Sequence, residues 1–465
     1  MTAGTGLAAA VRRLGQFHED PAAIAGWQAW TRPLLTRFTP GRRRALLALA
    51  ALYVAIKRPL KDMAPAVDLR SPGGPLAAAV VILLCLAVVT AAYVAARRFP
   101  SLPAAVRARP QIWLHAVFWA LVLICWLRPP GSGASGAASV VLSGLVLALP
   151  FLLWRIGYLL MSGQRGRVAG TRLSDHLLYC YPAYGGTNTP YGKGIDHLAR
   201  HEARSDEALA RSQLAGLKLL ALAWIYDRAL ELMAGLVHGE PGGLLSGHGL
   251  GLPRLDALMP AGEPAPWLTA WAAVYAGLVW DVLELAVRGH EIVGVLRLFG
   301  FNIFRNTYKP LLAPSLVEFW NRYHYYFKEL LVEFFFFPTY VRRFRGSPRL
   351  RMLVATFAAA GFGNLYYHLL QQDPFLLAGS WTAVRPWLET RSVYCGLLAL
   401  GIYVSMRREQ RRRGATTAAP ASMLIRLRRI AGVWTFFALI GIWGDAGTAS
   451  FGQRARFALG LFGLG

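Results

Sequence analysis

The chain has 465 residues, of which 55% are hydrophobic and only 16% are charged. Soluble domains carry about 25% charged residues, so this composition excludes an ordinary soluble globular enzyme. The apolar residues also gather in long runs, and a run of about twenty matches the hydrocarbon thickness of a bilayer. The sequence therefore predicts an integral membrane protein.

The charged residues are strongly unbalanced, with 50 lysines and arginines against 24 aspartates and glutamates, which gives a formal net charge of +26. The basic residues stand in short clusters beside apolar runs, as the positive-inside rule produces. This distribution argues against nucleic acid as a partner. The four cysteines are scattered without C-x-x-C spacing, so neither a disulfide framework nor a zinc site is expected.

The N-terminal segment, residues 1–43, is mixed and basic and contains tryptophans. It lacks the apolar core of a cleavable signal peptide, and we expect it to lie on the membrane surface. Residues 44–465 are expected to form one multi-span membrane domain.

Apolar runs follow one another through residues 44–465. Leu, Ala, Val and Phe dominate them without the alternation of β-strands, so helices are expected. The runs lie near 45–57, 76–96, 111–127, 137–161, 213–236, 266–287, 315–338, 349–371, 392–406 and 430–444. With a short apolar tail, they predict an all-α, polytopic transmembrane helical bundle of roughly nine to eleven spans.

Two arginine-rich clusters, at 342–351 and 407–413, bracket two of these runs. Two crossings return the chain to the same side of the membrane, and the loop between the runs, 372–391, has few charges. The positive-inside rule therefore predicts that both clusters are cytoplasmic in a multi-pass protein of the cell (plasma or inner) membrane.

Ionisable groups at membrane depth concentrate in residues 289–371, and such groups are functional candidates because they are costly in lipid. Ser315 is a plausible N-cap with Glu318 three residues later, the spacing of a capping box. On one long helix, Trp320 and His324 would share a face at i, i+4, with Asn321 beside His324 at i, i+3.

This stretch resembles the membrane-bound O-acyltransferase (MBOAT) family, in particular its bacterial polysaccharide O-acetyltransferase branch, of which alginate O-acetyltransferases are an example. Residues 289–301 look like a glycine-containing segment of that branch, and Asn306 and Pro310 follow in its order. The sequence FWNRYH at 319–324 resembles the family's F-W-x-x-W-H element, and GFGNLYYH at 361–368 occupies the place of its second histidine. The likeness covers about 80 residues.

The second histidine position is open between two residues. A gap-free overlay of the glycine-containing segment puts Asn364 in that position, whereas His368 supplies an imidazole four residues later on the same helical face. Chemistry favours His368, because an amide does not accept a proton from an alcohol at neutral pH. At the first site, the family's tryptophan before the histidine is replaced by Tyr323.

The resemblance implies transfer of an acyl group, acetyl in this branch, from a thioester donor to a hydroxyl group of an exported glycan or lipid. His368 is the expected general base, since histidine suits proton removal near neutral pH. His324 is expected to orient substrate or polarise the thioester, with Trp320 beside it. Asn364 would fix the tautomer of His368, and Asn321 would donate to the oxyanion.

The expected donor is an acyl-CoA or a carrier-protein thioester, used as a substrate, and no bound cofactor or metal is expected. Membrane lipid and accessory proteins of an export or modification system are the other expected partners. No serine or cysteine nucleophile with a neighbouring base is apparent, so direct transfer is preferred to an acyl-enzyme.

Other interpretations of the same residues stay open. The histidines and asparagines could be packed, satisfied polar groups in a membrane scaffold without catalytic activity. A secondary transporter would use buried acids and histidines as ion sites. The acids of two apolar runs, Asp227 with Glu231 and Asp281 with Glu284, are expected to pair with Arg228 and Arg288. The polar segment 162–212 holds His176, His197 and His201, which are interpreted as surface residues.

Overall fold

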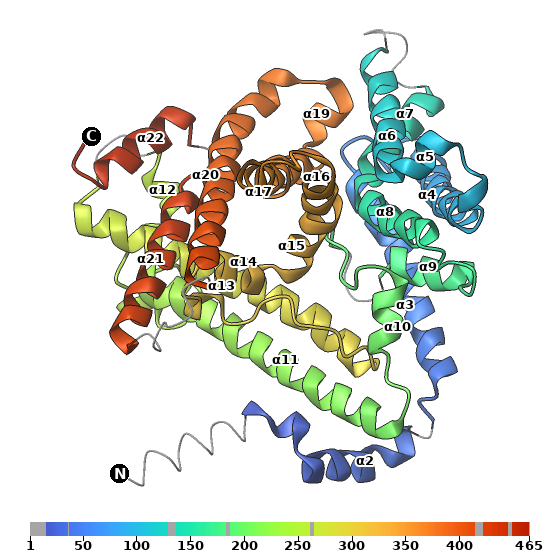
Figure 1. Cartoon of the computed structure of the whole chain (residues 1–465), viewed down its shortest axis with the longest axis horizontal. Helices are drawn as coiled ribbons and strands as arrows, with labels where there is room; N and C mark the ends of the chain where they lie inside the picture. Colours follow the sequence, from blue (N-terminus) through green and yellow to red (C-terminus); the bar gives the residue numbers. More distant parts are fainter. Residues whose placement is uncertain are drawn as a thin grey trace. The chain divides into compact units, whose positions relative to one another are not determined.

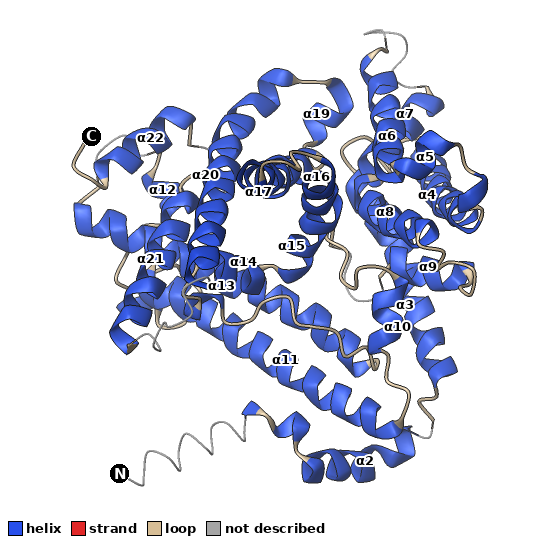
Figure 2. Cartoon of the chain, in the orientation of Figure 1, coloured by secondary structure: helices blue, strands red, loops and turns tan. Residues whose placement is uncertain are grey.

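The structure, a computed structural model, describes residues 15–35, 37–128, 136–182, 187–260, 265–413, 422–444 and 449–464. Within these ranges all regular elements are helices, and one isolated bridge joins Glu202 to Phe301 (Figure 2). The predicted all-α class is therefore confirmed. Residues 1–14 of the predicted surface segment lie outside the described residues.

The chain divides into two compact units. The first comprises Met1–Ala223 and Arg288–Arg305, and the second comprises Trp224–Val287 and Asn306–Gly465. The boundaries fall inside two long helices, α11 (Asp206–Leu232) and α13 (Trp267–Leu298). Residues 15–43 belong to the first unit.

The first unit is built from helices of very different lengths (Figure 1). They are α2 (Pro21–Leu35), α3 (Pro40–Met63), α4 (Gly74–Arg97), α5 (Ala104–Ala108), α6 (Pro110–Trp126), α7 (Ala137–Ala148), α8 (Pro150–Gln164), α9 (Leu173–Cys180) and α10 (Ile195–His201). Helix α8 is its centre and contacts α4, α6 and α9. Every residue of α8 from Pro150 to Met161 is buried, as expected for a helix that is apolar all round.

One charged side chain lies inside this apolar centre. Arg155 is 1% exposed, and its guanidinium donates to the backbone carbonyls of Phe151 and Thr187, both at 2.6 Å. The same guanidinium stacks on the Phe151 ring at 4.1 Å from the ring centre. These carbonyls supply the acceptors that a buried cation needs, so Arg155 ties the loop at 187–188 to α8.

Two described helices are long and apolar enough to cross a membrane, Gly74–Arg97 and Trp267–Leu298. The pair α7 and α8 would add a third crossing as one broken span, because it passes the same test together with a bend of 61°. These helices indicate a membrane protein. They coincide with the apolar runs predicted near 76–96, 266–287 and 137–161.

The second unit contains shorter and more interrupted helices (Figure 1). They are α12 (Leu255–Leu258), α14 (Leu316–Tyr323), α15 (Tyr325–Leu331), α16 (Phe337–Arg342), α17 (Pro348–Thr356), α18 (Asn364–Leu369), α19 (Asp373–Ala378), α20 (Trp381–Arg413), α21 (Met423–Gly441) and α22 (Phe451–Gly460). Helix α20 is the longest of them, with 33 residues, and it contacts α14, α17 and α21.

The prediction of one continuous helix over 315–338 is wrong. Ser315 does cap α14, accepting from the N–H of Glu318, but Glu318 pairs with Arg322. The helix then ends at Tyr323, and His324 has a non-helical backbone with φ −133° and ψ 74°. Trp320 and His324 therefore do not share a helix face at i, i+4.

Asn306 holds the chain at this break. Its backbone carbonyl accepts from the N–H of Tyr325 at 2.9 Å, and its side-chain Oδ1 accepts from the N–H of Tyr326 at 3.2 Å. Asn306 itself is 0% exposed. These two N–H groups belong to the first turn of α15, where no intrahelical acceptor exists, so Asn306 acts as the cap of that helix from a distant part of the sequence.

The two residues after Asn306 satisfy the other side of the break. The Thr307 hydroxyl donates to the carbonyl of Tyr323 at 2.9 Å, and the N–H of Tyr308 donates to the carbonyl of Arg322 at 2.7 Å. These carbonyls end α14 and also lack intrahelical donors. Residues 306–308, which we call the bridging segment, therefore replace the hydrogen bonds that a continuous helix would have made.

Two π-helical stretches shift the register of the helices that follow the break. They are η6 (Val332–Phe336), between α15 and α16, and η7 (Phe357–Gly363), between α17 and α18, and they contact each other. A Cβ on Gly363 would lie 2.7 Å from the Phe335 ring, so the close approach requires glycine there. Such π-turns are frequent at functional sites.

Replacing Asn306 with alanine should destabilise the second unit, because the buried N–H of Tyr326 loses its acceptor. An unsatisfied buried donor costs about 1–3 kcal/mol, which thermal unfolding of the purified protein would report as a lower apparent Tm. Asn321→Ala is the matched control, since Asn321 is exposed on α14. An Asn306→Ala protein as stable as this control would contradict the role of the bridging segment.

Candidate functional site

The two candidate histidines are brought together in the second unit by one aromatic ring. The Phe327 ring centre lies 5.2 Å from that of His324 and 6.0 Å from that of His368. Both imidazoles are partly accessible, whereas Phe327 is buried. His324 from the helix break and His368 from α18 therefore contact the same side chain.

Trp320 belongs to the same cluster, although it does not share a helix face with His324. It is buried, and its ring packs edge-on against Phe327 with 6.2 Å between ring centres. Tyr367 completes the set, at 4.7 Å from Phe327 and 5.2 Å from His368. These separations are typical of packed aromatic pairs. The cluster of Trp320, His324, Phe327, Tyr367 and His368 is the candidate site.

Asn364 lies one helical turn before His368, at the start of α18. It is 1% exposed, and its Oδ1 is buried without a hydrogen-bond partner among the described residues. An unpaired buried carbonyl oxygen is costly and can accept from a group that enters the site. Asn321, by contrast, is exposed on α14.

Arg391 adds a cation to the site from helix α20. It is 7% exposed and stacks on Tyr394, with its guanidinium carbon 4.6 Å from the ring centre. Its charge acts on His368 and on Tyr323, the residue next to His324 in the chain. The site therefore combines two imidazoles, a buried amide and a guanidinium.

A polar cavity lies elsewhere in the second unit. It has a volume of about 230 Å³, and its ionisable lining residues are His238, Arg254, Asp256, Asp281 and Glu284. Asp281 is accessible to it, although it lies in the long apolar helix α13. The hydroxyl of Tyr323 is close enough to Asp281 and Glu284 to interact with both electrostatically.

Arg254 is held in place at the wall of this cavity. Its Nη2 donates to Glu240 Oε2 at 2.9 Å, and its guanidinium lies 3.8 Å from the centre of the Trp280 ring. The hydrogen bond from Arg254 lowers the pKa of the Glu240 carboxyl group. The pair keeps one positive charge fixed beside the carboxylates of α13.

The acids expected to pair with a neighbouring arginine do so on α11. Arg228 lies 2.7 Å from Asp227 Oδ2 and 2.5 Å from Glu231 Oε2, so this group is an ion-pair cluster. The interpretation of the polar-segment histidines as surface residues is wrong in two cases. His176 and His197 are buried, at 1% and 9% exposure, and His201 is partly accessible. Among the described residues no group of three potential metal ligands is found.

Three site residues escaped the sequence reasoning for different reasons. Phe327 lies three residues after His324, a spacing that is visible in the sequence but is shared by many aromatic residues in that run. Tyr367 directly precedes His368, and in the sequence it is one residue of the GFGNLYYH motif without a separate signal. Arg391 comes from another helix, and no pattern connects it to the histidines.

No protein-family model matches this chain, and no curated protein matches it either. The site geometry is therefore the basis for assigning a function.

Proposed function

We propose that the chain is a membrane-bound O-acyltransferase that moves an acyl group, acetyl in the first instance, from a thioester to a hydroxyl group of an exported glycan or lipid. The proposal is supported above all by the packing of His324 and His368 against one ring, with both imidazoles partly accessible. Acyl transfer to an alcohol needs a base at the hydroxyl and a polarising group at the carbonyl. Two imidazoles, together with a buried cation whose charge acts on one of them, meet both needs.

In the proposed reaction His368 removes the proton of the acceptor hydroxyl as its oxygen attacks the thioester carbonyl carbon. The C–O bond forms, the C–S bond breaks, and the proton passes from the imidazolium to the departing thiolate. Arg391 stabilises the negative charge on the carbonyl oxygen between these two steps. His324 orients the thioester, and the buried Oδ1 of Asn364 accepts from a group bound at the site.

We assign the stabilisation of the oxyanion to Arg391 rather than to Asn321, because the two residues differ in burial. Arg391 is buried and its charge acts on His368, whereas Asn321 is exposed. A donor acts most strongly on a developing charge where water is excluded and the local dielectric constant is low. The donor substrate in this proposal is an acyl-CoA or a carrier-protein thioester.

The proposed architecture is a multi-span bundle of roughly nine to eleven crossings in the cell membrane, similar to that of the MBOAT family. It is supported by long helices besides the two apolar spans, namely α3 with 24 residues, α11 with 27 and α20 with 33. A helix needs about 20 residues to cross the hydrocarbon core. Accessory proteins of an export or modification system fit an acceptor that leaves the cell.

Replacing His368 or His324 with alanine should lower acyl transfer by about 10²-fold or more, which is the range for loss of a general acid or base. The measurement is transfer of radiolabelled acetyl from acetyl-CoA to candidate glycans by the purified full-length protein. His248→Ala is the matched control, because His248 is exposed in the same unit. Unaltered transfer by His368→Ala at equal yield and stability would remove His368 from the mechanism.

Replacing Arg391 with glutamine should lower kcat by about 10²-fold and change KM for the thioester little, because the charge acts in the transition state. Arg391→Lys keeps the charge and should recover part of kcat. Arg385→Gln is the control on the same helix, since Arg385 is exposed and paired with Glu389. Equal kcat values for Arg391→Gln and Arg385→Gln would contradict the oxyanion role.

A second candidate function, proton- or cation-coupled transport, is favoured by the polar cavity beside α13. Carboxylates in a membrane-crossing helix commonly mark an ion path, and both Asp281 and Glu284 line this cavity. In this reading the histidines of the candidate site would be packing residues or further ion ligands. A scaffold without catalysis would use neither site.

Replacing Asp281 with asparagine separates the two functions. A transporter should lose proton uptake into proteoliposomes, followed with an internal pH-sensitive dye, because the titrating carboxylate in the cavity is gone. Asp227→Asn is the control, since Asp227 is an acid on α11 whose charge is already paired with Arg228. Absence of proton uptake by the unaltered protein, or equal uptake by both variants, would exclude transport through this cavity.

A further inference from the structure

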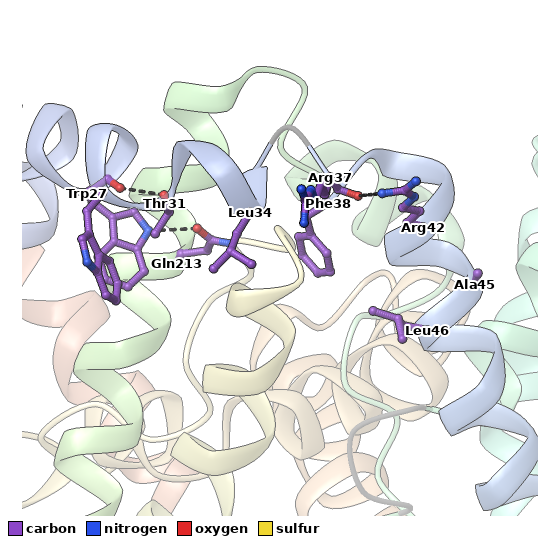
Figure 3. A pocket seen from close by; sticks show the side chains of 10 residues that line it. Trp27, Thr31, Leu34, Arg37, Phe38, Arg42, Ala45, Leu46 and Gln213 are labelled. Carbon is purple, nitrogen blue, oxygen red and sulfur yellow. Dashed lines mark hydrogen bonds between the residues drawn. The ribbon is translucent and has the colours of Figure 1, made fainter.

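An apolar groove opens in the first unit between α2 and α3 (Figure 3). Its volume is about 620 Å³, within the range of roughly 300–1,000 Å³ that small-molecule sites occupy. The apolar side chains that line it are Trp27, Trp30, Leu34, Phe38 and Leu46. This groove plays no part in the proposed acyl transfer.

The wall of the groove formed by α2 is fixed by specific contacts. Trp27 Nε1 donates to Gln213 Oε1 at 2.9 Å, and the Thr31 hydroxyl donates to the Trp27 carbonyl at 2.6 Å (Figure 3). Ile24 of α2 is buried against Ala210 and Leu214 of α11, and Trp27 packs against this cluster. Helix α2 is therefore anchored to the first unit, and Trp27 takes part in both the anchor and the groove wall.

The side chains at the groove are left uncovered to an unusual extent for their size. Trp30 is 73% exposed and Leu34 is 67% exposed. The Trp30 ring packs against the Trp27 ring, with 5.1 Å between the ring centres. The neighbouring face of α3 continues this surface with Leu46 and Leu49, at 47% and 66%. A contiguous apolar surface of this kind calls for an apolar occupant.

Two arginines line the groove between Leu34 and Leu46, Arg37 in the connection from α2 to α3 and Arg42 in the first turn of α3 (Figure 3). Arg42 Nη1 donates to the backbone carbonyl of Arg37 at 2.9 Å, and within the described part of the chain neither guanidinium meets a carboxylate. The adjacent Arg44 differs, since it lies within 4.0 Å of both Asp175 and Glu202. The groove therefore joins an apolar wall to two charges that are free for an anion.

We propose that this groove binds an anionic phospholipid of the surrounding membrane, with an acyl chain against Trp30, Leu34 and Leu46 and the phosphate on Arg37 and Arg42. A lipid supplies an apolar chain and a negative headgroup in one molecule, which matches both parts of the site. Basic side chains at a membrane surface bind anionic headgroups, and amphipathic segments rich in tryptophan and arginine lie at that depth. The bound lipid holds the N-terminal helix to the bilayer.

The test is a native mass-spectrometry titration of the full-length protein in detergent with phosphatidylglycerol and with phosphatidylcholine of the same acyl chains. The unaltered protein should bind phosphatidylglycerol more tightly. Arg37→Gln with Arg42→Gln should weaken that binding by about 5-fold for each guanidinium removed and leave phosphatidylcholine binding unchanged. Trp30→Ser should weaken the binding of both lipids, because it shortens the apolar wall.

Arg343→Gln with Arg345→Gln is the matched control, since both residues are exposed and Arg345 also donates to a backbone carbonyl. Equal loss of phosphatidylglycerol in the two double variants would overturn the proposal, and so would equal binding of the two lipids by the unaltered protein. Competition by glycerol phosphate would assign the arginines to a free phosphate instead. A dimer that Trp30→Ser separates would show a second copy in the groove, which would also overturn the proposal.

Discussion

Backbone hydrogen bonding at the break before α15 is the constraint on which the candidate site depends. In a bilayer or a packed helical core, an unpaired N–H or carbonyl costs several kcal/mol, so a helix cannot simply stop there. The bridging segment removes this cost by pairing with residues on both sides of His324. Without it, the most favourable backbone would be a continuous helix, and the imidazole of His324 would follow the helical periodicity of α14.

Aromatic packing then fixes where the two imidazoles lie. Phe327 is in the first turn of α15, so the same break that frees His324 from α14 also brings Phe327 toward α18. The π-turns η6 and η7 pack against each other with the Phe335 ring on Gly363, which sets the register of α18 and therefore of His368. The relation between the histidines thus rests on irregular backbone in both of the chain segments that supply them.

The helix positions in this protein could be predicted from apolar runs, and the interruptions could not. Runs near 76–96 and 266–287 correspond to α4 and α13, because about twenty mainly apolar residues favour one continuous helix. The run at 315–338 carries more charged side chains, and hydrogen bonds from residues 306–308 hold its break at His324. Those bonds are tertiary contacts and leave no periodic signal in the broken segment.

Only part of the candidate site could be predicted from the sequence, because tertiary contacts bring in residues that no motif contains. The order and spacing of the motif residues selected His324 and His368, and the structure places their rings on one phenylalanine. The motif pattern did not select Arg391, because the helix that carries Arg391 lies outside both motifs in the sequence. The burial of His176 and His197 was missed because the polar composition of 162–212 suggested a solvated loop, whereas α9 and α10 pack into the first unit.

The arginines of this chain have different physical roles, which their contacts in the structure distinguish. Buried arginines such as Arg155 and Arg454 donate to backbone carbonyls and serve the fold, with Arg454 reaching Ile442 at 2.5 Å and Ala449 at 3.1 Å. The buried charge of Arg391 also acts on an imidazole and a tyrosine hydroxyl. Removing a cation from water is costly wherever it is buried. A cation kept at that cost near the candidate histidines fits the negative charge that develops on the carbonyl oxygen in the proposed reaction.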